Sequence, residues 1–65
     1  MKSPMDEAVE LELSKRNKLF KGDFAKTEKF GNGYLATVYG PDLRPRSKWH
    51  VMEGRPMTLV EIDLE

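Results

Sequence analysis

The tripeptide Gly31-Asn32-Gly33 restricts the fold of this chain more than any other part of the sequence. It separates two runs, 24–30 and 34–39, in which aromatic and β-branched residues recur. Asparagine and glycine both tolerate positive φ angles, so an Asn-Gly pair between two such runs is a strong short-range signal for a β-hairpin. We therefore predict a hairpin over residues 24–39.

Two registers of this hairpin fit the sequence. A two-residue turn would place Phe30 opposite Leu35, whereas a three-residue loop would place Phe30 opposite Tyr34. Each register sets an aromatic residue against another apolar residue, and such cross-strand pairs stabilise a sheet. The sequence does not decide between them.

A second hairpin is predicted over residues 48–64, where apolar and polar residues alternate on both sides of a Gly- and Pro-containing segment. A four-residue loop at 53–56 would place Trp49 beside Val60 and would set opposite charges beside each other on the other face. Agreement on both faces makes this register the preferred one.

The N-terminal segment predicts a helix over about residues 4–21. Ser3 can cap its first turn, and Pro4 suits the first helical position. Acidic residues lie near its beginning and basic residues near its end, as the helix dipole favours, and Gly22 is a natural stop. The strict alternation over 9–13 favours a strand instead.

These elements predict an α+β fold in which an N-terminal helix packs on a small antiparallel sheet made of two hairpins. If residues 9–13 form a strand, the alternative is an all-β, five-stranded SH3-like barrel. A chain of 65 residues is too short to give two cores, so residues 1–65 are expected to form a single domain.

The chain has no cysteine, which excludes disulfides and cysteine-based zinc sites and suits the reducing cytoplasm. The first residues turn acidic where a signal peptide would need an apolar run. The longest apolar stretch, 34–36, is far too short to cross a membrane. We therefore expect a cytoplasmic protein with no membrane partner.

A domain of this size buries only about 60% of the surface that its unfolded chain exposes, so its stability is thin. Small domains are usually reinforced by disulfides, by a structural metal or by association with another chain. Disulfides are excluded here and metal ligands are scarce, so association remains, and a homodimer is one form that it can take.

Catalytic groups are few in this sequence. There is a single histidine, His50, and no spacing of acidic residues around it suggests a metal site or a general base with its partner. The serines lie outside any nucleophile motif. We expect no catalytic residues, no metal and no cofactor, and we predict that the protein is not an enzyme.

The formal net charge of zero conceals an uneven distribution of charge along the chain. Residues 1–14 carry a net charge of −3, residues 15–55 carry +6 and residues 56–65 carry −3, and every aromatic residue lies in the basic middle. Segregated charge of this kind orients a partner and speeds its association.

These observations favour a small module that acts by protein–protein contact, as an adaptor, assembly factor or inhibitor. Interfaces favour arginine and tryptophan as anchors, and such residues cluster in one stretch of the basic middle. The predicted binding residues are Arg44, Arg46, Lys48, Trp49 and Arg55.

The alternative is a module that binds single-stranded RNA or DNA. Such proteins combine basic side chains for the phosphates with aromatic rings on which bases stack. Lys15, Arg16, Lys18, Arg44, Arg46 and Lys48 would then contact phosphates, and Tyr34, Tyr39 or Trp49 would stack.

Overall fold

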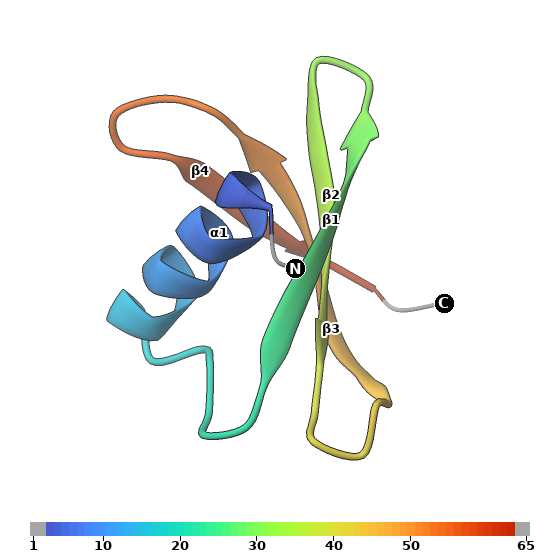
Figure 1. The fold of residues 1–65 in the computed structure, drawn as a ribbon. Coiled ribbons are helices and arrows are strands. Elements are labelled where there is room, and N and C mark those ends of the chain that lie inside the picture. The colour runs from blue at the N-terminus through green and yellow to red at the C-terminus, as the bar shows by residue number, and fades with distance from the viewer. Residues whose placement is uncertain (1–2, 64–65) are drawn as a thin grey trace.

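The computed structural model describes residues 3–63 and confirms the α+β prediction. Its strands form one antiparallel sheet in the order β1-β2-β3-β4, which stays open and does not close into a barrel. Figure 1 shows the helix lying against one side of this sheet. The elements are α1 (Pro4–Lys15), β1 (Phe24–Phe30), β2 (Gly33–Tyr39), β3 (Pro45–Met52) and β4 (Thr58–Ile62).

The helix α1 begins as the sequence predicts. The Ser3 hydroxyl accepts a hydrogen bond from the Asp6 backbone N–H at 3.1 Å, and the Asp6 carboxylate accepts from the Ser3 N–H at 3.4 Å. This reciprocal pair is a capping box, and Pro4 occupies the first turn beside it. The SH3-like alternative is wrong because residues 9–13 are helical.

The helix ends at Lys15, well before the predicted end near residue 21. Asn17 adopts a positive φ of 59°, and the Lys18 N–H donates to the Leu13 carbonyl at 2.8 Å while the Asn17 N–H donates to the Ser14 carbonyl at 3.1 Å. These bonds form a Schellman motif with Asn17 in the left-handed position that glycine usually takes. Asn17, not Gly22, therefore ends the helix.

Both predicted registers of the first hairpin are wrong. Phe30 pairs with Gly33, so the two turn residues are Gly31 and Asn32. Gly31 supplies the positive φ, at 58°. Gly33 belongs to β2 instead, because a Cβ at this position would collide with the Val51 carbonyl oxygen of β3.

The register of the second hairpin also differs from the prediction by one residue. Trp49 pairs with Glu61, and Val51 pairs with Leu59, because the loop contains the five residues 53–57. One residue of slip exchanges the two faces of a strand. Val60 therefore lies on the opposite face of the sheet from Trp49, beside which the sequence placed it. The predicted end of the hairpin at residue 64 lies outside the described residues.

The core lies between α1 and the sheet. Leu13, Val9, Val38 and Val51 are its largest fully buried side chains, and Trp49 closes it at 6% exposure. The eight buried hydrophobic residues include two alanines, so the apolar volume that holds the fold is small. Because so little apolar volume is buried, we infer that this core stabilises the fold less than the core of a larger domain does.

Candidate interaction surface

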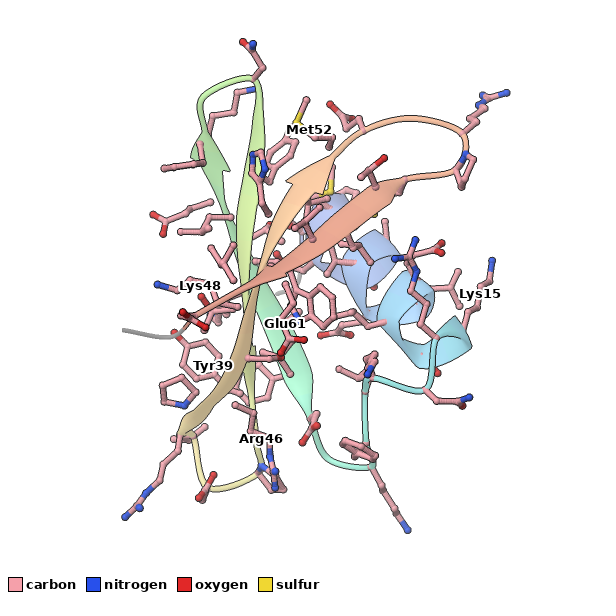
Figure 2. All side chains as sticks on the ribbon, turned by 180° about the vertical axis from the view of Figure 1, so that it is seen from behind. Lys15, Tyr39, Arg46, Lys48, Met52 and Glu61 are labelled. Carbon is pink, nitrogen blue, oxygen red and sulfur yellow. The ribbon has the colours of Figure 1, made fainter. Side chains whose placement is uncertain are left out.

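The structure does not bring the five predicted binding residues together. Arg44 lies in the β2–β3 loop, Arg55 lies in the β3–β4 loop, and Lys48 lies on the side of the sheet away from α1 (Figure 2). Arg46 and Trp49 line one pocket. Trp49 is a core residue, whose indole N–H donates to the Ser47 hydroxyl at 2.9 Å.

Three of the arginines in the basic middle of the chain have carboxylate partners within the fold. These ion pairs place guanidinium and carboxylate atoms 3.3 to 3.8 Å apart and join Arg16 to Glu12, Arg44 to Asp42 and Arg46 to Asp23. Each pair offsets a positive charge locally. Of these pairs only Arg16–Glu12 joins the basic middle of the chain to the acidic N-terminal segment, because Asp23 and Asp42 themselves lie in the basic middle.

The Arg46–Asp23 pair depends on a bulge in the sheet. Val38 pairs with Ser47 and the next residue, Tyr39, pairs with Pro45, so Arg46 is the extra residue. A bulge of this kind turns a side chain out of the regular alternation. Arg46 reaches the Asp23 carboxylate, with Nε 3.4 Å from Oδ1.

Asp23 is a nearly buried carboxylate just before β1. Its side chain is 2% exposed, and Oδ2 accepts a hydrogen bond from the Phe20 N–H at 3.1 Å. Among the described residues Asp23 Oδ1 accepts no hydrogen bond, and its ion-pair partner is the Arg46 guanidinium. The side chain of Arg46 also passes Gly40 so closely that a Cβ there would lie 2.6 Å from its Nε. This cluster fixes the α1–β1 loop to the sheet.

The described part of the surface is hollowed beside Asp23 and at the start of α1. The hollow beside Asp23 and Trp49 encloses about 260 Å³, and a shallower one between the start of α1 and β1 encloses about 480 Å³. Ligand pockets commonly exceed 300 Å³ and enclose most of their ligand. The first is small and the second is open, and His50 lines neither.

Within residues 3–63 no three or more acidic or histidine side chains form a group that could hold a metal ion. The one helix of this part of the chain is too short and too polar to cross a membrane.

The helix closes the β1 edge of the sheet with two carboxylates one turn apart. Asp6 Oδ1 accepts from the Thr27 N–H at 2.9 Å and from the Thr27 hydroxyl at 2.5 Å. Glu10 Oε2 accepts from the Ala25 N–H at 2.8 Å. These two N–H groups are donors that an edge strand otherwise offers to another strand.

Asp6 is itself buried, at 9% exposure. Burial alone would raise its pKa, but the hydrogen bonds from Thr27 and Ser3 outweigh burial and hold the pKa of this carboxyl below its ordinary value of 3.8. Sequence reasoning assigned Asp6 only to the helix dipole. Its i,i+4 spacing from Glu10 was the signal that one side of the helix carries two acceptors.

The side of the sheet away from α1, which we call the open face, has no helix over it in the described part of the chain (Figure 1). Tyr39 and Lys48 point away from α1 on this side (Figure 2). Alternation from the buried core residues assigns the other members. The open face comprises Phe24, Lys26, Glu28, Phe30, Gly33, Leu35, Thr37, Tyr39, Pro45, Lys48, His50, Met52, Thr58, Val60 and Ile62.

Apart from Gly33, no residue of the open face is buried. Phe30 is 54% exposed, Val60 is 53% exposed and Ile62 is 38% exposed. Exposed apolar side chains that occur singly are ordinary, but several on one uncovered sheet face make that face a candidate interaction surface. Sequence reasoning missed this surface because its register placed Val60 beside Trp49, which is a core residue.

Aromatic rings also contact one another on the open face. Phe24 stacks on Tyr39, with ring centroids 5.5 Å apart, and Phe30 meets His50 edge to face at 5.7 Å. Phe30 lies on β1 and His50 on β3, and the two can meet because Gly33 has no side chain on the β2 strand between them. The open face therefore carries two separate aromatic contacts, one near each end of β1.

Comparisons with protein-family models, with curated proteins and with solved structures found no match to this chain.

Proposed function

We propose that this protein is a small, non-enzymatic cytoplasmic module that binds another protein through the open face. The observation that carries this proposal is the exposure of Phe30, Val60 and Ile62 together on a sheet face that no described helix covers. Burying such a face removes apolar area from water, and each Å² removed contributes about 25 cal/mol of favourable free energy. A partner protein with a flat apolar surface would bury this area, and the complex would be stabilised by it.

The charge on the open face supports a protein partner. Its ionised side chains are Lys26, Glu28 and Lys48, so the face carries a net charge of +1 from three separated groups. Nucleic-acid surfaces usually concentrate many more basic groups, because each phosphate contact releases a counterion. Here the nearby arginines are also paired with carboxylates.

A second candidate function is binding of single-stranded nucleic acid on the same face. It is favoured by the two aromatic contacts, Phe24–Tyr39 and Phe30–His50, which offer ring surfaces on which bases can stack. Lys26 and Lys48 would then contact phosphates. Arg16, Arg44 and Arg46 would contribute less than the sequence suggests, because each has an internal carboxylate partner.

Site-specific photocrosslinking tests the proposed function. A p-benzoylphenylalanine in place of Val60 should give crosslinks to protein in cells that express the chain, because Val60 is 53% exposed on the open face. Leu11 is the matched control position, since it is an aliphatic residue 60% exposed on α1. Crosslinks at both positions alike, or at neither, would contradict the proposal.

Salt titration separates the second candidate from the first. Affinity for a labelled single-stranded RNA or DNA should be measurable at low salt and fall steeply as salt rises if phosphates are contacted. Absence of binding at 50 mM salt would exclude nucleic acid as the ligand.

A further inference from the structure

We infer that the partner of the open face is a second copy of this chain, packed sheet against sheet. This inference rests on the proposed function, in which the open face binds protein. The registers of the three strand pairs align the open-face side chains in rows across the sheet. From one end these rows are Phe24-Tyr39-Pro45, Lys26-Thr37-Lys48-Ile62, Glu28-Leu35-His50-Val60 and Phe30-Gly33-Met52-Thr58.

The order of these rows is self-complementary. We place a twofold axis between the two sheets, perpendicular to the strands and midway between the second and third rows. Rotation about this axis lays the second row of one copy on the third row of the other. Lys26 of each copy then faces Glu28 of the other, and Ile62 faces Val60. Two opposite-charge pairs and two apolar pairs form at once, as an isologous interface requires. Lys48 faces His50, which supplies no opposite charge.

The other way of packing two open faces does not match. An axis along the strands would keep each row and lay β1 of one copy over β4 of the other. Lys26 would then face Ile62, and Glu28 would face Val60. Charged groups would be desolvated against apolar ones, which costs free energy without compensation. The register therefore selects the first arrangement.

The size of the face sets the strength of the association. With strands about 4.8 Å apart and a rise of about 3.3 Å per residue, four strands of this length cover roughly 450 Å². Two such faces bury roughly 900 Å² in total, which is below the about 1,200 Å² of stable specific interfaces and in the range of weak ones. We therefore expect a dimer with a dissociation constant in the micromolar range.

The small core gives the chain a physical reason to associate. Within residues 3–63 of the single chain only eight hydrophobic residues are buried, and Ala25 and Ala36 are two of them. Packing a second copy on the open face would convert the two layers of each chain into four, helix, sheet, sheet and helix, and would bury Phe30 and Val60 as well. Small domains without disulfides commonly gain stability in this way.

A pair of charge reversals tests the arrangement. Position 26 of each copy faces position 28 of the other. In a homodimer of Lys26→Glu both of these positions would carry carboxylates, and in a homodimer of Glu28→Lys both would carry ammonium groups. Both positions are exposed, so each variant should keep the circular dichroism spectrum of the wild type. In sedimentation velocity from 1 to 500 µM, the wild type should form a dimer and each variant should remain monomeric.

Mixing the two variants is the decisive step. Opposite charges then face each other, and the mixture should form a heterodimer although neither variant dimerises alone. Contacts within each chain do not change on mixing, so a structural effect of either substitution cannot produce this result. A wild type that stays monomeric up to 500 µM would overturn the inference, as would a mixture that stays monomeric.

The crosslinking experiment on Val60 separates failure of this inference from failure of the proposed function. A crosslinked product of two identical chains supports the inference. Crosslinks to a different protein only, with a monomeric purified chain, overturn the second copy and leave the proposed function standing. No crosslink at all overturns both.

Discussion

Asp6 on the first turn of α1 accepts two hydrogen bonds from Thr27 at the edge of the sheet, one from the backbone N–H at 2.9 Å and one from the hydroxyl at 2.5 Å. The same carboxylate completes the helix cap through Ser3. One side chain thus ties the start of the helix to the strand on which it packs.

Asp6→Ala should lower the free energy of unfolding by about 2 to 3 kcal/mol, because it leaves two half-buried donors of Thr27 without this acceptor and removes half of the capping box. Urea denaturation followed by circular dichroism measures this loss. Glu7→Ala is the matched control, since Glu7 is an exposed acid in the same turn. Equal losses from the two variants would show that only the helix dipole matters.

The same carboxylate makes the stability depend on pH. Its pKa in the folded chain lies below the ordinary value of 3.8, so its contribution is present above that value and is lost as the pH falls through the folded pKa. The difference in free energy of unfolding between the wild type and Asp6→Asn should therefore be largest near neutral pH and shrink below about pH 4. Urea denaturation from pH 2 to 7 measures it. A difference that does not change with pH would contradict the assignment.

Asn17 should respond to substitution as a left-handed helix cap. Asn17→Ala should cost about 1 kcal/mol, because a Cβ disfavours a positive φ, whereas Asn17→Gly should be neutral or stabilising. Thermal denaturation of the two variants side by side tests this order. If alanine is tolerated as well as glycine, the Schellman motif contributes little.

Substitutions of Gly33 and Gly31 should differ in their effect on stability, although Gly31 lies in the turn and Gly33 directly follows it. Gly33→Ala forces a Cβ against the Val51 carbonyl and the Met52 sulfur, and we expect a loss of about 3 kcal/mol. Gly31→Ala meets no atom within 4 Å, so only the positive φ opposes it and the loss should be about 1 kcal/mol. Urea denaturation midpoints rank the two, and the reverse order would refute the close approach of β2 to β3.

Substitutions of the two arginines of the β2–β3 region should have unequal effects on stability. Arg46→Met removes the cation beside a carboxylate that is 2% exposed, and we expect a loss of about 1 to 3 kcal/mol. Arg44→Met should have little effect, because that side chain is 85% exposed and its ion pair is screened by water. Chemical denaturation of both variants provides the comparison. Similar small effects would mean that Asp23 is compensated by other groups.

Local signals in the sequence were sufficient for the elements and insufficient for their registers. Ser3 and Pro4 marked the start of the helix, and the glycines around Asn32 marked the first hairpin. The turn sits one residue earlier than an Asn-Gly pair suggests because Gly33 is needed where β2 approaches β3. That requirement is a tertiary contact, and no pattern within residues 24–39 contains it.

The candidate site could be predicted only in part, for a related reason. Val60 and Leu59 are both apolar, and the length of the loop before them decides which one faces the core. The bulge at Arg46 likewise separates this side chain from Lys48, which the sequence places only two residues away. Sequence proximity suggested one basic surface, whereas folding distributes these residues over opposite sides of the sheet.

The carboxylates that close the β1 edge also limit how this chain can aggregate. A sheet that lengthens without end needs two free edges on every molecule, so that β4 of one chain pairs with β1 of the next. Asp6 and Glu10 already occupy the N–H groups of Thr27 and Ala25 on β1. Strand pairing between native molecules is therefore opposed along this part of β1 and favoured at β4, and a pair joined β4 to β4 presents only the protected β1 edges for further growth.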